Sequence, residues 1–416
     1  MAGLRRRVVV TGLGTVTPLG IGVKETWASL LAGKSGAGPI TLYDSSKHDV
    51  HIAAEVKNWQ PENFMEKKEA RRMDRFSQFA VGAAKEAIED AKLDTSKIDT
   101  ARAGVVLGTG IGGILTIEEQ KEVQLTKGPG RVTPFLIPRL MGNAAAGHIA
   151  IFHHLRGPNF CVVTACAAAA NSIGSAMRLI QYDEADVMVC GGSEAAIVPL
   201  GMAGFANMGA LSKRNDDPAR ASRPFDKERD GFLQGEGAGV IVIESLEHAL
   251  KRDARIYCEL GGYGLSGDAH HITAPCEDGD GGVRAMQLAI KDAGLTINDV
   301  DYINAHGTST PINDRVESIA IKKVFGERAY KIPVNSSKSM SGHLLGAAGG
   351  FEAVVSTLSI VEDTIHQTIN LTNPDPDCDL DYVTEGVRKR PVNVALSNSL
   401  GFGGHNASLL FRKFKL

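Results

Sequence analysis

Short apolar runs alternate along the chain with helical patterns built from small side chains. Residues 160–163 form one such run and predict a buried strand, and the alanine-rich segment from residue 167 onward predicts a closely packed helix. Residues 8–10 open the chain with another apolar run that also predicts a strand. Strands that alternate with helices favour an α/β fold in which helices cover parallel-rich sheets.

The same order of elements occurs twice along the chain. We therefore predict two α/β halves, residues 1–252 and 253–416, that pack around their small-residue helices. The paired segments are, in chain order, "RRVVVTGLG" with "RIYCELGGYG", 84–110 with 284–309, "FCVVTACAAAANSIGSAMRLI" with "IPVNSSKSMSGHLLGAAGGFEAVVSTLSI", and "DVMVCGGSEA" with "VNVALSNSLG".

The first half carries two long insertions, at about residues 112–157 and 196–235. Two packed halves create a cleft where strand ends converge, and such clefts hold ligands in α/β proteins. We expect the insertions to form substrate walls and contacts between two copies of the chain.

Charge and hydropathy narrow the class of partner. The 416 residues carry a formal net charge of -3, so no bulk basic field favours a nucleic acid or an anionic membrane. No uninterrupted apolar stretch approaches transmembrane length. The cysteines at 161, 166, 190, 258, 276 and 378 form no CxxC pair, so the spacing predicts free thiols in a reducing, cytoplasmic compartment.

Cys166 stands at the predicted junction between a strand and a helix. Backbone N–H groups at a helix start stabilise an anion, so this position predicts a lowered thiol pKa and a nucleophilic thiolate. The competing interpretation is that Cys166 is a small buried hydrophobic residue, as the strand positions of Cys161, Cys190 and Cys258 suggest for those thiols.

Two histidines occupy comparable places in the second half. His306 follows a predicted strand in "NAHGTSTPIND", and His343 lies at the helix start that the repeat aligns with Cys166. The pseudo-twofold symmetry of the repeat predicts that Cys166, His306 and His343 meet. Such a trio could bind zinc, but zinc ligands usually come in closely spaced pairs and these three do not.

Four segments carry a family resemblance: "TACAAAANS", "NAHGTSTPIND", "SSKSMSGHLLGAAGG" and "SNSLGFGGHNASL". They resemble the signature segments of the β-ketoacyl acyl-carrier-protein synthases of the thiolase superfamily, and the resemblance runs from end to end. It implies a thiolase-like fold of two duplicated halves packed as a five-layered αβαβα core. Alanines replace the Thr, Gly or Ser of many relatives after the cysteine, which we expect to affect packing rather than chemistry.

The resemblance implies a decarboxylative Claisen condensation that elongates fatty acids by two carbons. Cys166 would hold the acyl chain, with the backbone N–H groups of Cys166 and Phe402 stabilising the oxyanion. His306 and His343, as neutral imidazoles, would stabilise the enolate that forms when malonyl carrier protein loses carbon dioxide. A plain thiolase needs a second cysteine as base, and no candidate stands near "SNSLGFGG".

The resemblance also assigns supporting roles. Lys338 and Glu317 would pair behind the histidines, and Thr308 and Thr310 would contact the phosphopantetheine arm. Ile111 would touch the acyl chain at the floor of a tunnel at the dimer interface. Phe402, between glycines, would also gate access to Cys166.

The implied partners are the acyl- and malonyl-loaded acyl carrier protein and a second copy of the chain, paired through the strand in "NFCVVTA". The basic cluster at 67–76 would suit an acidic carrier protein, or it is a solvated helix face. The only cofactor group implied is the pantetheine arm, which the carrier protein brings; no resident cofactor or metal is expected.

Three alternatives remain open from the sequence. The chain could be a ketosynthase of a polyketide or specialised lipid pathway, because such enzymes share the core motifs. It could be a non-catalytic chain-length partner subunit, although such subunits normally lack the nucleophile. It could also bind or scaffold acyl groups without catalysis.

Overall fold

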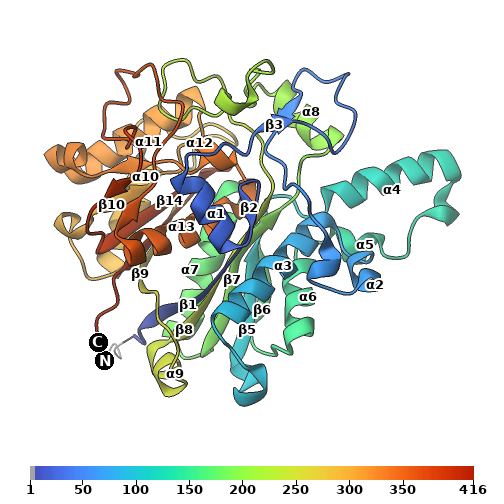
Figure 1. The fold of residues 1–416 in the computed structure, drawn as a ribbon, viewed down its shortest axis with the longest axis horizontal. Coiled ribbons are helices and arrows are strands. Elements are labelled where there is room, and N and C mark those ends of the chain that lie inside the picture. Colours follow the sequence, from blue (N-terminus) through green and yellow to red (C-terminus); the bar gives the residue numbers. More distant parts are fainter. Residues whose placement is uncertain (1–4) are drawn as a thin grey trace.

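The chain folds around one mixed sheet of 11 strands in the computed structural model, which describes residues 5–416 (Figure 1). The first half contributes β1 (Val8–Thr17), β2 (Gly20–Ile21), β5 (Ala103–Gly108), β6 (Asn159–Val162), β7 (Val187–Glu194) and β8 (Gly237–Ser245). The second half contributes β9 (Cys258–Gly267), β10 (Tyr302–Asn304), β11 (Val334–Asn335), β14 (Val394–Gly401) and β15 (His405–Arg412). Two small ribbons pair β3 (Gly38–Pro39) with β4 (Ile52–Ala53) and β12 (Thr364–Ile365) with β13 (Arg388–Lys389).

The strand order confirms the predicted duplication. It runs β11-β10-β14-β15-β9-β1-β8-β7-β5-β6, so the halves repeat one order outward from β9 and β1. These two strands join the halves through only two residue pairs, Val9 with Glu259 and Val10 with Cys258. The boundary placed between residues 252 and 253 falls in the connection after α9 (Leu246–Lys251), just before β9.

The expectation of parallel-rich sheets is wrong for the inner strands. Among the strands of residues 5–416, β5 pairs in parallel with β6 and β7, and β10 pairs in parallel with β11 and β14. The β7–β8, β8–β1, β14–β15 and β15–β9 pairs are antiparallel. The β14–β15 connection is a short turn at residues 402–404 with no crossover helix, so those strands must run in opposite directions.

Helices complete the predicted five layers. Helices α3 (Arg75–Asp90) and α6 (Ala144–His153) cover the outer face of the first half, and α10 (Asp280–Asp292) and α11 (Pro311–Phe325) cover that of the second. Between the two sheet halves, α7 (Ala168–Gln181) packs against α13 (Ala348–Glu362). The remaining helices are α1 (Val23–Leu31), α2 (Lys67–Ala70), α4 (Ile114–Lys127), α5 (Leu136–Leu140), α8 (Pro199–Asn207) and α12 (Lys338–Ser341).

Small side chains allow the central layer to form. A Cβ added to Gly108 of β5 would lie 2.3 Å from the Ala168 carbonyl carbon, and one added to Gly239 of β8 would lie 2.1 Å from the Phe351 nitrogen. The alanines after Cys166 are buried at this contact, as expected for residues that serve packing. The segment Leu345–Glu362 is long and apolar enough to span a membrane, but 89% of it is buried inside the protein.

The two insertions lie beside the end of the sheet where the site forms. Residues 112–157 include α4, which projects from the body of the molecule (Figure 1). Helix α4 buries only Thr116, so most of its surface faces outward. Residues 196–235 include α8 and a long loop that reaches over the second half.

Candidate active site

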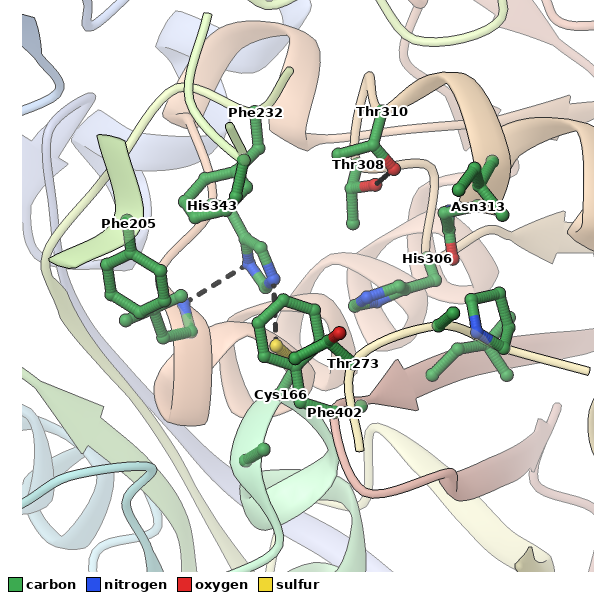
Figure 2. A pocket seen from close by; sticks show the side chains of 18 of the residues that line it. Cys166, Phe205, Phe232, Thr273, His306, Thr308, Thr310, Asn313, His343 and Phe402 are labelled. Atoms are coloured by element: carbon green, nitrogen blue, oxygen red, sulfur yellow. Dashed lines mark hydrogen bonds between the residues drawn. The ribbon is translucent and has the colours of Figure 1, made fainter. Parts of the chain in front are cut away.

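A sharp turn presents Cys166 at the end of β6. Ala165 adopts a left-handed φ of 48°, residues Ala165–Ala167 form one 3-10 turn, and α7 begins at Ala168. The thiol opens into a cavity of about 570 Å³ that His306 and His343 also line. The structure therefore brings the predicted trio together, and the three ligand atoms lie within 4.8 Å of one another (Figure 2).

His343 faces the thiol as a hydrogen-bond donor. Its Nε2 lies 3.1 Å from the Cys166 Sγ, while the Leu345 amide donates to its Nδ1 at 3.2 Å (Figure 2). Because Nδ1 is occupied as an acceptor, the ring proton of the neutral imidazole sits on Nε2. Burial, and then the nearby Lys338 charge, holds the pKa of His343 well below its usual value, so the ring stays neutral.

His306 approaches from the second half at right angles to His343. The ring centroids are 5.2 Å apart and the rings are nearly perpendicular. The backbone N–H groups of His306 and Gly307 both donate to Glu317 at 2.8 Å, which fixes the turn. Burial, followed by the Lys338 charge, lowers the pKa of His306 well below its usual range, so it too is neutral.

The hydrogen bonding argues against zinc at this trio. A zinc-binding histidine donates its second ring N–H to a carboxylate, carbonyl or water, which leaves the ligating nitrogen unprotonated. In His343 the second nitrogen instead accepts the Leu345 amide, which places the proton on the nitrogen that faces Cys166.

The expected lowering of the thiol pKa is wrong as a net effect. Burial, together with the Glu194 charge, raises the pKa of the Cys166 thiol to about 11 and outweighs the Lys338 charge and the backbone N–H groups of Phe402 and Cys166, which lower it. Those two amides are also the predicted oxyanion donors, and both favour negative charge beside the sulfur. The helix start works as expected, but its effect is smaller than the cost of charging a buried sulfur.

The predicted Lys338–Glu317 pair is also wrong. Lys338 Nζ makes a buried ion pair with Glu352 of α13, whereas Glu317 holds the backbone beneath His306. Burial raises the pKa of both glutamates to about 7. Glu352 was missed, although a carboxylate in the interior of the apolar helix 348–362 is itself a signal that a buried cation faces it.

The repeat aligns differently from the sequence prediction. Leu345 has a φ of 47°, Leu345–Ala347 form a 3-10 turn, and α13 begins at Ala348, which matches the turn around Cys166. The counterpart of Cys166 is therefore Gly346. His343 lies three positions earlier and reaches the site from the preceding loop.

The other predicted residues line the same cavity. Thr308 and Thr310 share a hydrogen bond of 2.9 Å at its wall, and Phe402 lies nearby (Figure 2). Ile111 also lines the cavity. Ile111 is 41% exposed. Two aromatic side chains that the sequence did not single out also belong to the site: Phe232 packs edge-on against His343 with centroids 5.4 Å apart, and Phe205 packs against Phe232.

The basic cluster at 67–76 divides between two roles. Lys67, Lys68 and Arg71 are exposed, whereas Arg75 turns inward to a buried ion pair with Glu236 at 2.7 Å. Only the exposed members remain available to a partner.

Comparisons with known proteins agree with this geometry. Residues 5–249 match the family described as "Beta-ketoacyl synthase, N-terminal domain", and residues 257–372 match "Beta-ketoacyl synthase, C-terminal domain". The chain is 54% identical to 3-oxoacyl-acyl-carrier-protein synthase 2 of Synechocystis sp., and the match covers 100% of both chains. It is 51% identical to the Staphylococcus aureus (strain COL) protein of the same name, with 99% of each chain covered.

Solved structures show the same fold. A β-ketoacyl synthase from Burkholderia phymatum superposes with a TM-score of 0.92 at 36% identity, covering 99% of this chain and 100% of that one. The ishigamide ketosynthase/chain length factor superposes with a TM-score of 0.93 at 39% identity over the same shares. The thiolase-like fold is confirmed, and the chain belongs to the β-ketoacyl synthase family of acyltransferases.

Proposed function

We propose that this chain is an elongating 3-oxoacyl-acyl-carrier-protein synthase that condenses malonyl carrier protein with an acyl chain held on Cys166. The observation that carries the proposal is the pairing of Cys166 Sγ with a donor Nε2 of His343 at 3.1 Å, beside a second neutral imidazole. Identities of 51–54% to synthases of this name support the substrate class.

The first step is acyl transfer. The Cys166 sulfur attacks the thioester carbonyl of acyl carrier protein, and the pantetheine thiol leaves with the proton that Cys166 gives up. The negative charge on the carbonyl oxygen is stabilised by the amides of Cys166 and Phe402, the same groups that lower the pKa of the thiol. The thiolate needed for attack is favoured by Lys338 and by the His343 N–H.

The second and third steps are decarboxylation and condensation. Malonyl carrier protein loses carbon dioxide, and the enolate oxygen that results receives hydrogen bonds from His306 and His343. Both rings are neutral, so each carries one N–H group that it can donate to the enolate oxygen. The enolate carbon then attacks the acyl-Cys166 carbonyl, and the thiolate leaves as the 3-oxoacyl product forms.

The acyl carrier protein is the proposed partner and brings the only cofactor group. Its phosphopantetheine arm would pass Thr308 and Thr310, whose hydroxyls line the cavity. A solved relative is a type II polyketide acyl-carrier protein in complex with its ketosynthase, at 38% identity. We propose no resident cofactor or metal.

A homodimer in the cytoplasm is the proposed assembly. Strand β6 is the edge strand of the first half, with Phe160 39% exposed and Val163, just beyond it, 60% exposed. An unpaired apolar edge of this kind invites pairing with another strand. A partner's β6 would cover this edge together with Ile111.

The test is condensation by purified protein supplied with malonyl carrier protein and a panel of saturated and unsaturated acyl carrier proteins. We expect a 3-oxoacyl product two carbons longer by mass spectrometry, formed through an acyl adduct on Cys166. No product with any straight-chain primer would contradict the proposal. Repeated extension without reduction of the keto groups would instead identify a polyketide ketosynthase, which the resemblance to the ishigamide enzyme keeps as the second candidate.

A further inference from the structure

Glu194, the last residue of β7, is a fully buried carboxylate that the proposed steps do not use. Its side chain is 0% exposed, and no salt-bridge partner lies within 4.0 Å among residues 5–416. A buried charge is costly unless hydrogen bonds replace its hydration, so a carboxylate in this position needs an explanation.

Four donors surround the Glu194 carboxylate. Oε1 accepts from the Thr109 hydroxyl at 2.9 Å and the Ile111 amide at 3.2 Å. Oε2 accepts from the Gly110 amide at 2.6 Å and the Gly346 amide at 3.0 Å. Each oxygen thus faces two donors, an arrangement suited to an ionised group. Burial raises the pKa of Glu194, and these four hydrogen bonds oppose the rise.

The donors come from both halves of the molecule. Thr109, Gly110 and Ile111 form the turn after β5, whereas Gly346 lies in the turn before α13. The two turns are in direct contact, because a Cβ added to Gly346 would lie 2.1 Å from the Gly110 nitrogen. Glu194 therefore holds together two backbone segments that belong to different repeats.

Each of these turns carries part of the site. Ile111 lines the cavity beside Cys166, and Leu345, next to Gly346, lines it too. The Leu345 amide sets the tautomer of His343. Glu194 itself does not line the cavity, so it holds the wall through its neighbours. Its charge also raises the pKa of the Cys166 thiol, an effect that changes alkylation by any reagent alike.

We propose that Glu194 is a positioning residue that locks the turn at 109–111 to the turn at 345–347, and so holds the acyl-pocket wall and His343 in place around Cys166. The inference rests on the proposed function only for its turnover readout. The pocket readout below requires no substrate, so failure of this inference is distinguishable from failure of the proposed function.

The test compares Glu194→Gln with the wild type by alkylation of Cys166 with N-ethylmaleimide and N-octylmaleimide, with the labelled residue identified by mass spectrometry. The ratio of the two rates reports the pocket wall, because the thiol pKa cancels. In Glu194→Gln an NH2 group faces two donors, so we expect the turn to shift into the cavity and the octyl-to-ethyl ratio to fall about tenfold.

Glu86→Gln is the matched control. Glu86 is also a carboxylate that accepts two backbone N–H groups, those of Thr15 at 2.9 Å and Val23 at 2.8 Å, and neither residue lines the cavity. Its ratio should equal that of the wild type. A general loss of stability would not change the ratio, so an equal fall in Glu86→Gln would overturn the proposal.

If Glu194→Gln does not fold, Thr109→Val decides, because it removes one of the four donors and keeps the charge. A lowered ratio in either folded variant supports the proposal, and an unchanged or raised ratio overturns it. With carrier-protein substrates, the same variant should shift its primer preference toward shorter chains relative to the wild type. An unshifted preference in a variant that condenses would also overturn it.

Discussion

The two turns at the centre of the molecule share one backbone geometry and do different chemistry. In the first half, Ala165–Ala167 lead into α7, and in the second half, Leu345–Ala347 lead into α13. The first residue of each turn is left-handed, with φ of 48° at Ala165 and 47° at Leu345. The middle residue is Cys166 in one turn and Gly346 in the other.

This difference teaches how a duplicated fold divides a reaction. The first turn exposes a nucleophile to the cavity, whereas the second offers only backbone N–H groups, one to His343 and one to Glu194. The side chains that donate protons or carry positive charge, His306, His343 and Lys338, all come from the second half. In the proposed mechanism the first half therefore holds the acyl chain, and the second supplies the side chains that stabilise negative charge.

Removing the nucleophile should have the largest effect. Cys166→Ala is expected to lose condensation by at least ~10³-fold, because no other thiol can form the acyl intermediate. Decarboxylation of malonyl carrier protein should continue, since both imidazoles remain. Mass spectrometry of the acyl adduct and carbon dioxide release measure the two steps. Normal condensation by this variant would refute covalent catalysis.

Removing a hydrogen-bond donor that the second half supplies should slow the decarboxylation step. His343→Ala is expected to lower malonyl decarboxylation by ~10²–10³-fold, the usual cost of one oxyanion donor. His343→Gln, which keeps an N–H donor, is the matched control and should retain more of the rate. Equal decarboxylation by His343→Ala and the wild type would assign the enolate to other groups.

Adding a side chain to the second turn tests whether the two turns are interchangeable. Gly346→Ala places a Cβ 2.1 Å from the Gly110 nitrogen and 2.7 Å from Glu194 Oε2. Such overpacking should destabilise the fold by about 1–3 kcal/mol or more. Cys166→Ala carries a Cβ at the equivalent position and should unfold near the wild-type temperature. Equal melting temperatures for the two variants would contradict the close contact.

The sequence was sufficient for the features that local pattern and repetition encode. The duplication, the central helix layer and the meeting of Cys166 with two histidines all follow from matched segments. It was insufficient where several buried groups act together. The resemblance assigned Lys338 to Glu317, and nothing local in the sequence corrects it, because Glu352 faces the lysine only after α12 and α13 pack.

The prediction of a lowered pKa for the Cys166 thiol was wrong for a similar reason. A helix start is visible in the sequence, but the water removed by Phe402, His343 and the other walls is a property of the assembled cavity. The predicted alignment of the two repeats was also wrong by three residues. His343 and Gly346 are that far apart, and only backbone geometry shows which of them matches Cys166.

The pH dependence of alkylation tests that assembled environment. Because burial raises the pKa of Cys166 from 9.0 to about 11, its alkylation by iodoacetamide should increase about tenfold per pH unit from pH 7 upward, without a plateau below pH 10. Free cysteine, measured in parallel, should level off earlier. A plateau of Cys166 labelling near pH 8 would show that the helix start and Lys338 outweigh burial.

Phe402 should give the smallest effect and the most specific one. It lies among glycines in the turn between β14 and β15, with Gly403 at a φ of 82°. Its backbone amide lowers the pKa of Cys166, which lies in the turn of the first half. Phe402→Ala keeps that amide while removing the ring, so folding and part of the activity should survive. If the ring delays malonyl entry until Cys166 is acylated, decarboxylation without a primer should rise relative to the coupled rate, by about threefold to tenfold for a gating contact of ~1 kcal/mol.

Phe232→Leu, which alters an aromatic wall on the His343 side, is the comparison: it should change the rates without raising that ratio. An unchanged ratio in a Phe402→Ala protein that folds and assembles like the wild type would mean that the ring only packs against the site.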